Sequence, residues 1–297
     1  MPTHPLAPLI DLPGVAGAVD EVREACTGLR WHSALRRGWP VARAEAGLRC
    51  AQAGLVVDGL SVPLSRVRAL AAGAGHAASD GSGQEGPGRP GTGRVDPAAA
   101  AVLGAIRVQS SVVADWGPPG SPTARVPLGQ LLARLHSAAV VGTAPVAEPG
   151  RLRTTEQPGD LRGLGPAPTG RDLGSRMAAL ADLDAYQGRG SGAVQVPGLV
   201  VAAVLLGELL VLRPFAAANG PVARAVFRRR LTADGVDAVG VVVPEVAWAA
   251  APLVHLSAAA GYATGSAEGV AAWIRHCAAA VLAGAGEGVA VAESVTT

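Results

Sequence analysis

The sequence predicts an all-α protein, because apolar residues recur at helical spacing in one segment after another. The clearest stripe lies in residues 126–139, where four leucines fall on one helical face. Residues 198–212 hold a single charged side chain, Glu208, which indicates a helix buried on nearly all sides and too short to cross a bilayer. Apolar residues make up 49% of the 297 positions, ample for a buried core in one large or two modest domains.

Two helices are expected toward the N-terminus. Residues 15–31 are weakly helical, and Pro40 starts a stronger helix that ends at Asp58, whose following glycine suits a C-terminal turn. Gly, Pro and Ser fill residues 73–95 without apolar periodicity, so we expect a flexible insertion there rather than a domain boundary. The apolar stripe expected on the second helix consists of Val41, Ala44, Leu48, Ala51 and Leu55.

The rest of the chain alternates helices with loops. Asp96 and Pro97 supply a cap and a first-turn proline to a helix that reaches residue 114. Five prolines between residues 140 and 171 preclude a long helix there. A glycine-rich break at 188–192 then leads into the buried helix. The remaining expected helices cover residues 172–186, 221–231, 243–261 and 266–284, the last of them capped by Ser266.

Composition excludes several classes of function. The net charge of +2 and the lack of a basic run interleaved with aromatic residues argue against a nucleic-acid partner. Lysine is absent and every such position is arginine, which we attribute to genomic composition bias. The three cysteines are scattered, so neither a metal site nor a disulfide framework is indicated. The start of the chain does not resemble a signal peptide, and we expect a cytoplasmic protein with no membrane partner.

The segment from residue 212 to residue 224 joins two predicted helices and has the chemistry of an anion site. Asn219 or Gly220 can cap the second helix, and Pro221 suits its first turn. Free N–H groups and the helix dipole attract an anion at such a start, and Arg224, about one turn in, is disfavoured there unless it meets a negative charge. A phosphate would supply that charge. The alternatives are that Arg224 pairs with a carboxylate such as Glu208 or extends to water.

This segment resembles the motif HPFx[DE]GNGRxxR of the Fic family, whose members mostly transfer AMP from ATP to a hydroxyl group of a target protein. The match is ungapped over the motif segment, which we define as residues 213–224. The matching residues are Pro214, Phe215, Asn219, Gly220 and Arg224, and the departures are Arg213, Ala217, Ala218 and Pro221.

The departures fall on the family's reactive groups. Arg213 stands where the resemblance implies a catalytic His, and a guanidinium cannot act as a base because it stays protonated and offers only donors. Ala217 replaces the acidic residue that holds Mg²⁺, so we expect no Mg²⁺ site. What survives is Asn219, Gly220 and Arg224, which could still hold the phosphate of ATP or another nucleotide.

The resemblance implies two further features. Fic proteins often carry an inhibitory helix whose terminal Glu pairs with the second motif arginine, and residues 54–59 match its ending loosely, with Asp58 in place of that Glu. Asp58 would then pair with Arg224, although a plain helix terminus explains the same residues. A segment beginning G-x-x-R matches at residues 150–153 and would start a β-hairpin flap for docking a target protein, here residues 150–168. An ordinary connecting loop is the alternative, because β-branched residues are few.

Three histidines, His136, His255 and His276, lie inside helical patterns, and we expect structural or solvent-facing roles for them. Either of the last two could approach the motif segment in space.

We therefore expect an all-α, Fic-like helical core with a loop or β-hairpin flap. It would span residues 40–284, with an N-terminal segment at 1–39 and a tail at 285–297. The leading functional hypothesis is a Fic-like protein that has lost AMP transfer and at most binds a nucleotide or phosphate. A second is an antitoxin-like or scaffolding interaction module, and we also consider a homodimer. A third keeps activity, with Arg213 gripping a phosphate and another group supplying the base.

Overall fold

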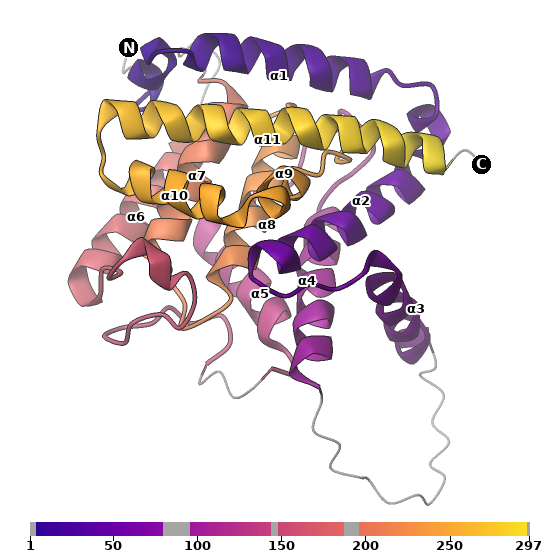
Figure 1. Ribbon diagram of the computed structural model, residues 1–297, viewed down its shortest axis with the longest axis horizontal. Coiled ribbons are helices and arrows are strands. Elements are labelled where there is room, and N and C mark those ends of the chain that lie inside the picture. Colours follow the sequence, from indigo (N-terminus) through magenta and orange to yellow (C-terminus); the bar gives the residue numbers. More distant parts are fainter. Residues whose placement is uncertain (1–3, 80–95, 144–147, 187–195, 296–297) are drawn as a thin grey trace, which may run out of the picture.

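The chain folds into an all-α structure, seen in a computed structural model that describes residues 4–79, 96–143, 148–186 and 196–295 (Figure 1). Within those ranges there is no strand, as the sequence predicts. The helices are α1 (Val15–Arg30), α2 (Leu35–Val57), α3 (Leu64–Ser79), α4 (Pro97–Val113), α5 (Leu128–Val140), α6 (Gly170–Tyr186), α7 (Gly198–Leu212), α8 (Asn219–Ala233), α9 (Glu245–Ala250), α10 (Pro252–Ala263) and α11 (Ala267–Ser294), with short 3-10 helices η1 (Ala7–Asp11) and η2 (Arg162–Leu164).

The centre of the fold is α7. All its residues are buried except Gly198, Glu208 and Val211, as expected for a helix with one charged residue. It packs on α8, α6, α10 and α11, and α1 lies side by side with α11 along one edge of the molecule (Figure 1). The predicted caps are present: the side chain of Asp96 accepts from Ala98 N at 3.1 Å, and that of Ser266 accepts from Gly269 N at 3.1 Å.

The start and the buried face of α2 differ from the prediction. The helix begins at Leu35 and continues through Pro40, because Leu35 is buried and the Trp39 ring lies 4.5 Å from the Arg43 guanidinium. Val41 and Ala44 are exposed. Of the expected stripe, Ala51 and Leu55 are buried, and the rest of the inward face is Ala42, Arg43, Ala46, Gly47 and Cys50. Small and apolar residues occur all around this helix, so its periodicity alone did not select the face.

Residues 73–79, expected in a flexible insertion, belong to α3. This helix packs on α2 and α4, where Val67, Leu55 and Ile106 form a small cluster separate from the main core. The rest of the expected insertion, 80–95, and the glycine-rich break at 188–192 lie outside the described residues.

The C-terminal half brings two more corrections. The helix expected over 243–261 is broken into α9 and α10 at Ala251, directly before Pro252, because proline disfavours helical backbone in the residue before it. The last helix continues past Gly284 to Ser294, through most of the expected tail. By length and composition α11 could cross a membrane, but half of the qualifying window is buried inside the fold, as in the core helix of a globular protein.

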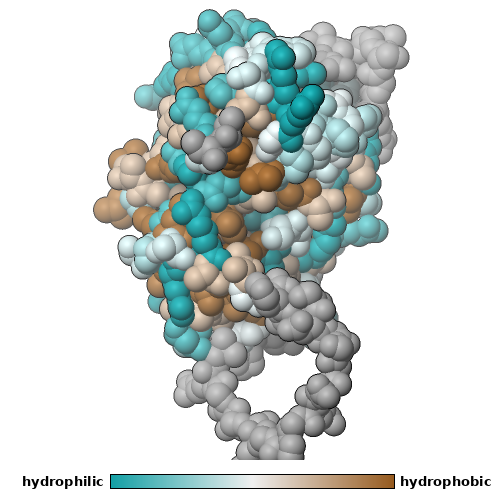
Figure 2. All heavy atoms as spheres, turned by 90° about the vertical axis from the view of Figure 1, so that its right-hand side faces the viewer, coloured by the Kyte–Doolittle hydropathy of each residue, from teal (hydrophilic) through white to brown (hydrophobic). Residues whose placement is uncertain are grey.

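The face of the molecule shown in Figure 2 mixes the two kinds of side chain, with hydrophobic patches interspersed among hydrophilic ones. Apolar residues contribute much of any folded protein's surface, so scattered patches of this kind need no partner.

Candidate functional site

The motif segment joins α7 to α8 through a tight loop (Figure 1). Arg213 and Ala218 both adopt left-handed backbone, with φ of 42° and 60°. The Asn219 side chain closes the loop: its Oδ1 accepts from Phe215 N at 2.8 Å and its Nδ2 donates to Phe215 O at 2.9 Å. Asn219 therefore holds the loop by its side chain and is the first residue of α8, while Ala218 takes the capping position.

The N-terminus of α8 already has an anion, the carboxylate of Asp160. This carboxylate accepts from Asn219 N at 2.7 Å and from Asn219 Nδ2 at 2.7 Å. Burial raises the pKa of the Asp160 carboxyl, the hydrogen bonds from Asn219 oppose that shift, and the nearby charge of Asp58 adds to it. The start of α8 therefore binds an anion, and that anion is a side chain of the same protein.

The guanidinium of Arg213 donates to backbone carbonyls. Its Nη1 donates to Leu161 O at 2.9 Å and its Nη2 to Gly165 O at 2.7 Å, and the residue is 2% exposed. Burial lowers the pKa of Arg213, and the charge of Asp160 opposes this shift. A guanidinium in this position fastens the loop and offers no lone pair for accepting a proton.

A second arginine, Arg153, fastens the flap segment (residues 150–168) to the end of α7. It donates to Arg213 O at 2.6 Å and Leu212 O at 2.7 Å, and also to Pro168 O at 2.7 Å and Glu156 O at 3.0 Å. Sequence reasoning placed this residue only as the end of a G-x-x-R match and missed its role. Four carbonyl acceptors around one buried guanidinium make it the main tie between the two segments.

The flap segment contains no β-hairpin, although the structure describes all of it. It is an irregular loop with the short helix η2, and it lies against the motif segment through backbone hydrogen bonds. Arg153 N donates to Pro214 O at 2.9 Å, and Gly159 N donates to Ala216 O at 2.8 Å. The hairpin part of the expected flap is therefore wrong, because too few β-branched residues are present to favour strands.

Arg224 pairs with Asp58, as the resemblance implied. Its guanidinium donates to both carboxylate oxygens, at 2.6 and 3.1 Å, and to Gly54 O at 3.1 Å. Burial acts to lower the pKa of Arg224, but the Asp58 carboxylate outweighs it and the net pKa is raised. Gly220 permits the approach, because a Cβ there would lie 2.7 Å from Asp58 Oδ1. The alternative partner Glu208 instead accepts from Arg176 and Tyr262.

Two other arginines of α8 are buried. Arg228 and Arg229 lie inside the fold, as does Arg224. Arg228 donates to Gln109 Oε1 and Gly240 O, at 2.9 and 2.7 Å, and Arg229 donates to Asp115 at 3.2 Å. The helix is buried on both faces, with acceptors brought in from distant parts of the chain.

The three histidines have structural surroundings. His136 stacks on Phe215 with ring centroids 3.9 Å apart, and its Nδ1 accepts from Gly150 N at 2.9 Å. That acceptor role uses the lone pair a base would need, and burial lowers the pKa of His136. His255 Nδ1 lies 3.1 Å from His276 Nε2. Burial, followed by the charges of Arg224 and His276, lowers the pKa of His255 to about 3.

A buried acid, Glu245, went unnoticed in the sequence. It is 1% exposed, and burial raises the pKa of its carboxyl against the opposing charges of Arg228 and Arg224. In the sequence it appears only as an acid that follows a proline at the start of a helix. Together Asp58, Asp160 and Glu245 balance the buried arginines around α8.

Cavities at the motif segment are small. One of about 70 Å³ borders Ala216, and one of about 10 Å³ borders Arg224. Ligand pockets usually begin at about 300 Å³. No group of three or more His, Cys, Asp or Glu side chains suited to a metal ion occurs in the described part of the chain.

Comparison with known proteins identifies the fold. A Fic family protein from Desulfovibrio desulfuricans superposes with a TM-score of 0.66 at 20% identity, covering 94% of this chain and 74% of that one. Fic-1 from C. elegans superposes with a TM-score of 0.58 at 18% identity, covering 95% of this chain and 75% of that one. No family model and no curated protein matches the sequence. The chain is therefore an all-α protein with the Fic fold.

Proposed function

We propose that this Fic-fold protein does not transfer AMP and that its motif segment is a closed phosphate-type site. The observation that carries the proposal is the carboxylate of Asp160 on Asn219 N and Nδ2, each at 2.7 Å. The start of a helix attracts one anion, and here the protein supplies it. A bound phosphate would have to displace Asp160.

The chemistry of transfer supports the same conclusion. Attack of a hydroxyl group on a phosphate needs a base for the hydroxyl proton and a cation on the phosphate oxygens. Arg213 can supply no base, and its donors already bind Leu161 and Gly165 carbonyls. Ala217 has no oxygen for Mg²⁺. His136 is the histidine that contacts Phe215, and its Nδ1 is engaged by Gly150.

For nucleotide binding, we propose ATP or a related nucleotide as the ligand, without Mg²⁺, on Asn219, Gly220 and Arg224. Asp160 and Asp58 hold this site shut, because each places a carboxylate where a phosphate oxygen would bind. Arg224 can reach a phosphate only after its two hydrogen bonds with Asp58 open. Nucleotide affinity of the wild type is therefore expected to be weak.

The transfer part is tested by incorporation of label from α-³²P-ATP into the protein or a cell lysate. We expect none from the wild type or from Arg213→His. The double variant Arg213→His with Ala217→Asp supplies a base and a metal ligand. Adding Asp160→Asn to it removes a carboxylate that closes the site. Label in the wild type would overturn the proposal, and loss of that label in Arg213→Ala would assign the activity to Arg213.

The binding part is tested by calorimetric titration with ATP, ADP and AMP, with and without Mg²⁺. Removing the Asp160 charge in Asp160→Asn should tighten binding at least about tenfold, and Arg224→Ala should abolish it. Equal affinity in the wild type, Asp160→Asn and Arg224→Ala would exclude the motif segment as the binding site. No binding to the double variant Asp160→Asn with Asp58→Asn, which lacks both closing carboxylates, would exclude a nucleotide site altogether.

A second candidate function, protein interaction, is favoured by the first turn of α10. Leu253 and Val254 are 81% and 58% exposed, and α10 packs against η2 of the flap segment. We propose this turn and the flap segment as a docking face for a target protein or a second copy of the chain. Sedimentation across a concentration range tests the second copy: a dimer that persists unchanged in Leu253→Ser would exclude this face from it.

A further inference from the structure

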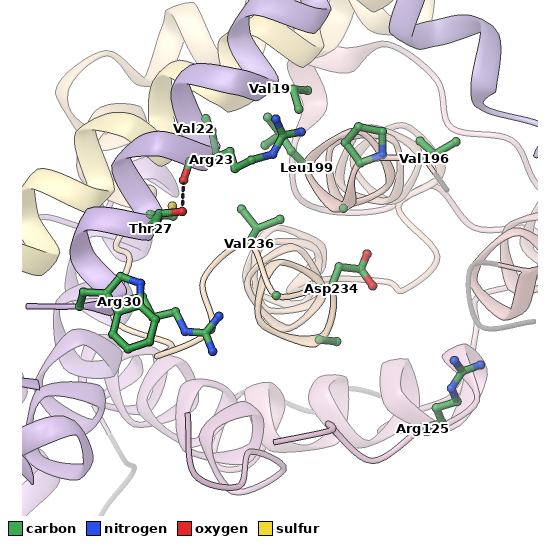
Figure 3. A pocket seen from close by; sticks show the side chains of 17 residues that line it. Val19, Val22, Arg23, Thr27, Arg30, Arg125, Val196, Leu199, Asp234 and Val236 are labelled. Carbon is green, nitrogen blue, oxygen red and sulfur yellow. Dashed lines mark hydrogen bonds between the residues drawn. The ribbon is translucent and has the colours of Figure 1, made fainter. Parts of the chain in front are cut away.

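A cavity of about 590 Å³ lies between α1, the start of α7 and the end of α8 (Figure 3). It is at the opposite end of α8 from the motif segment, and a helix of 15 residues separates the two by about 20 Å. Its size is that of a pocket for a drug-sized ligand, in the range of about 300 to 1,000 Å³. None of the functions considered above uses it.

Three arginines line the cavity. Figure 3 shows Arg23, Arg30 and Arg125 spaced around it, with Asp234 between them at the end of α8. Arg23 pairs with Asp20 on the same helix. Within the described residues, no carboxylate forms an ion pair with Arg30 or Arg125. These two side chains therefore bring positive charge to the cavity that the described residues leave unbalanced.

Asp234 forms no ion pair with these arginines in the described part of the chain. Its two oxygens accept from the Nε and Nη2 atoms of Arg230, the first of these bonds being 2.8 Å long. Arg230 thus forms a bidentate pair with it, the geometry in which a carboxylate is best satisfied. The arginines also have no role in capping α8. Its last carbonyls, those of Arg230, Leu231 and Thr232, already accept backbone N–H groups from the turn that follows.

Polar groups form most of the exposed lining of the cavity, and apolar side chains lie behind them. Val19 and Val22 of α1 and Leu199 of α7 are buried there. At the rim, the Trp31 indole is 70% exposed and lies 5.3 Å from the Arg30 guanidinium. An exposed indole beside a free cation can stack on a flat apolar group while the cation binds its charge.

We propose that this cavity binds an organic anion, namely an aromatic group that carries a phosphate or carboxylate. Arg30 and Arg125 attract the charged group, and the exposed indole of Trp31 receives the aromatic part. The site is independent of the motif segment.

The test is calorimetric titration with 1-naphthyl phosphate, with 1-naphthol and inorganic phosphate as its uncharged and non-apolar halves. Wild type should bind 1-naphthyl phosphate at least about tenfold more tightly than either half. Arg30→Gln and Arg125→Gln should each weaken that binding several-fold. The matched control is Arg66→Gln, an exposed arginine of α3 outside the cavity, which should leave it unchanged.

Three results would overturn the proposal. They are no binding to the wild type, equal binding of 1-naphthol, or equal affinity in Arg30→Gln, Arg125→Gln and Arg66→Gln. Thermal unfolding followed by circular dichroism checks that each variant is folded, and all three arginines are exposed, so little loss of stability is expected.

Discussion

A single carboxylate, that of Asp160, binds the start of α8. It satisfies one backbone N–H of α8 and one side-chain N–H of Asn219. Such contacts favour the charged form, yet burial is the larger effect and the pKa of Asp160 is raised. The charge is therefore kept at a cost to stability, and that cost can be measured.

The stability contributed by Asp160 should fall as the pH rises. An acid with a raised folded pKa contributes most below its unfolded pKa of about 3.9 and loses that contribution as the pH passes through the folded pKa. In Asp160→Asn this decline should disappear from the curve of unfolding free energy against pH, measured with urea between pH 4 and 8. Asp172→Asn, a carboxyl in the exposed first turn of α6, is the control. A wild-type curve that matches that of Asp160→Asn would contradict the assignment.

His255 should act in the opposite direction. Its folded pKa of about 3 lies below the ordinary 6.5, so the unfolded chain binds the extra proton between these values. Stability is full above about pH 6.5 and falls as the pH drops, by about 2 kcal/mol at pH 5. His255→Phe, which fits among Trp248 and Trp273, should flatten the slope between pH 5 and 6.5. Equal slopes in both proteins, measured by urea unfolding, would show that another group is responsible.

At the scale of elements, two glycines of α11 allow the effect of close packing to be measured apart from that of helix propensity. A Cβ on Gly284 would lie 2.6 Å from Val243 C and 2.7 Å from Pro244 N, both backbone atoms that cannot yield easily. Gly286, two residues on, has open space around it. Gly284→Ala should destabilise the protein by about 1–3 kcal/mol. Gly286→Ala should stabilise it by up to about 1 kcal/mol.

Thermal and urea unfolding of the two alanine variants measure this difference. If Gly284→Ala were as stable as Gly286→Ala, the approach of α11 to the backbone at Val243 would be looser than the structure shows. The comparison holds helix, residue type and substitution constant, so it isolates the contact with the neighbouring backbone.

The sequence predicted elements whose signal is local. A single charge in α7 and the leucine stripe of α5 mark buried helices without any knowledge of partners, and the caps at Asp96 and Ser266 are local too. By contrast, α3 was assigned in part to a loop, because alanine and glycine at its end carry no periodicity. Packing on α2 and α4 stabilises it as a helix, and those contacts cannot be inferred from the sequence of α3 alone.

The candidate site divides in the same way. The pairing of Asp58 with Arg224 followed from the resemblance to a known family, and the structure contains it. Asp160 and Arg153 lie in a loop that has no periodic pattern. Their partners include residues far along the chain: Asp160 binds Asn219, and Arg153 binds the carbonyls of Leu212 and Arg213 as well as nearer ones. Only the folded chain brings such residues together.

At the scale of the whole molecule, the two ends of the α7 and α8 pair differ. At one end the flap segment, Asp160 and Asp58 cover the motif segment. At the other end a cavity of about 590 Å³ is open to solvent. The proposed ligand site therefore lies at the opposite end of this helix pair from the motif segment.

Hydrogen exchange should reproduce this layering. Amides of α7, buried on nearly all sides, should exchange only through global unfolding and show the greatest protection. Amides of α3, which packs mainly on α2 and α4 around a small separate cluster, should exchange fastest among the long helices. Mass spectrometry of peptic peptides measures both. Protection of α3 equal to that of α7 would mean that the two clusters unfold as one unit.

Arg213 also sets the cost of placing a base at its own position. Its guanidinium donates to two carbonyls, Leu161 O and Gly165 O, and a neutral imidazole, which has one N–H donor, cannot satisfy both. Arg213→His would leave at least one buried acceptor unpaired, at about 1–3 kcal/mol, before any chemistry was gained. A domain with stability of about 5–15 kcal/mol can lose that much and stay folded, at the cost of a looser loop. The position can therefore serve as a structural tie or as a base, and a change that provides the base needs a second change that binds the freed carbonyl.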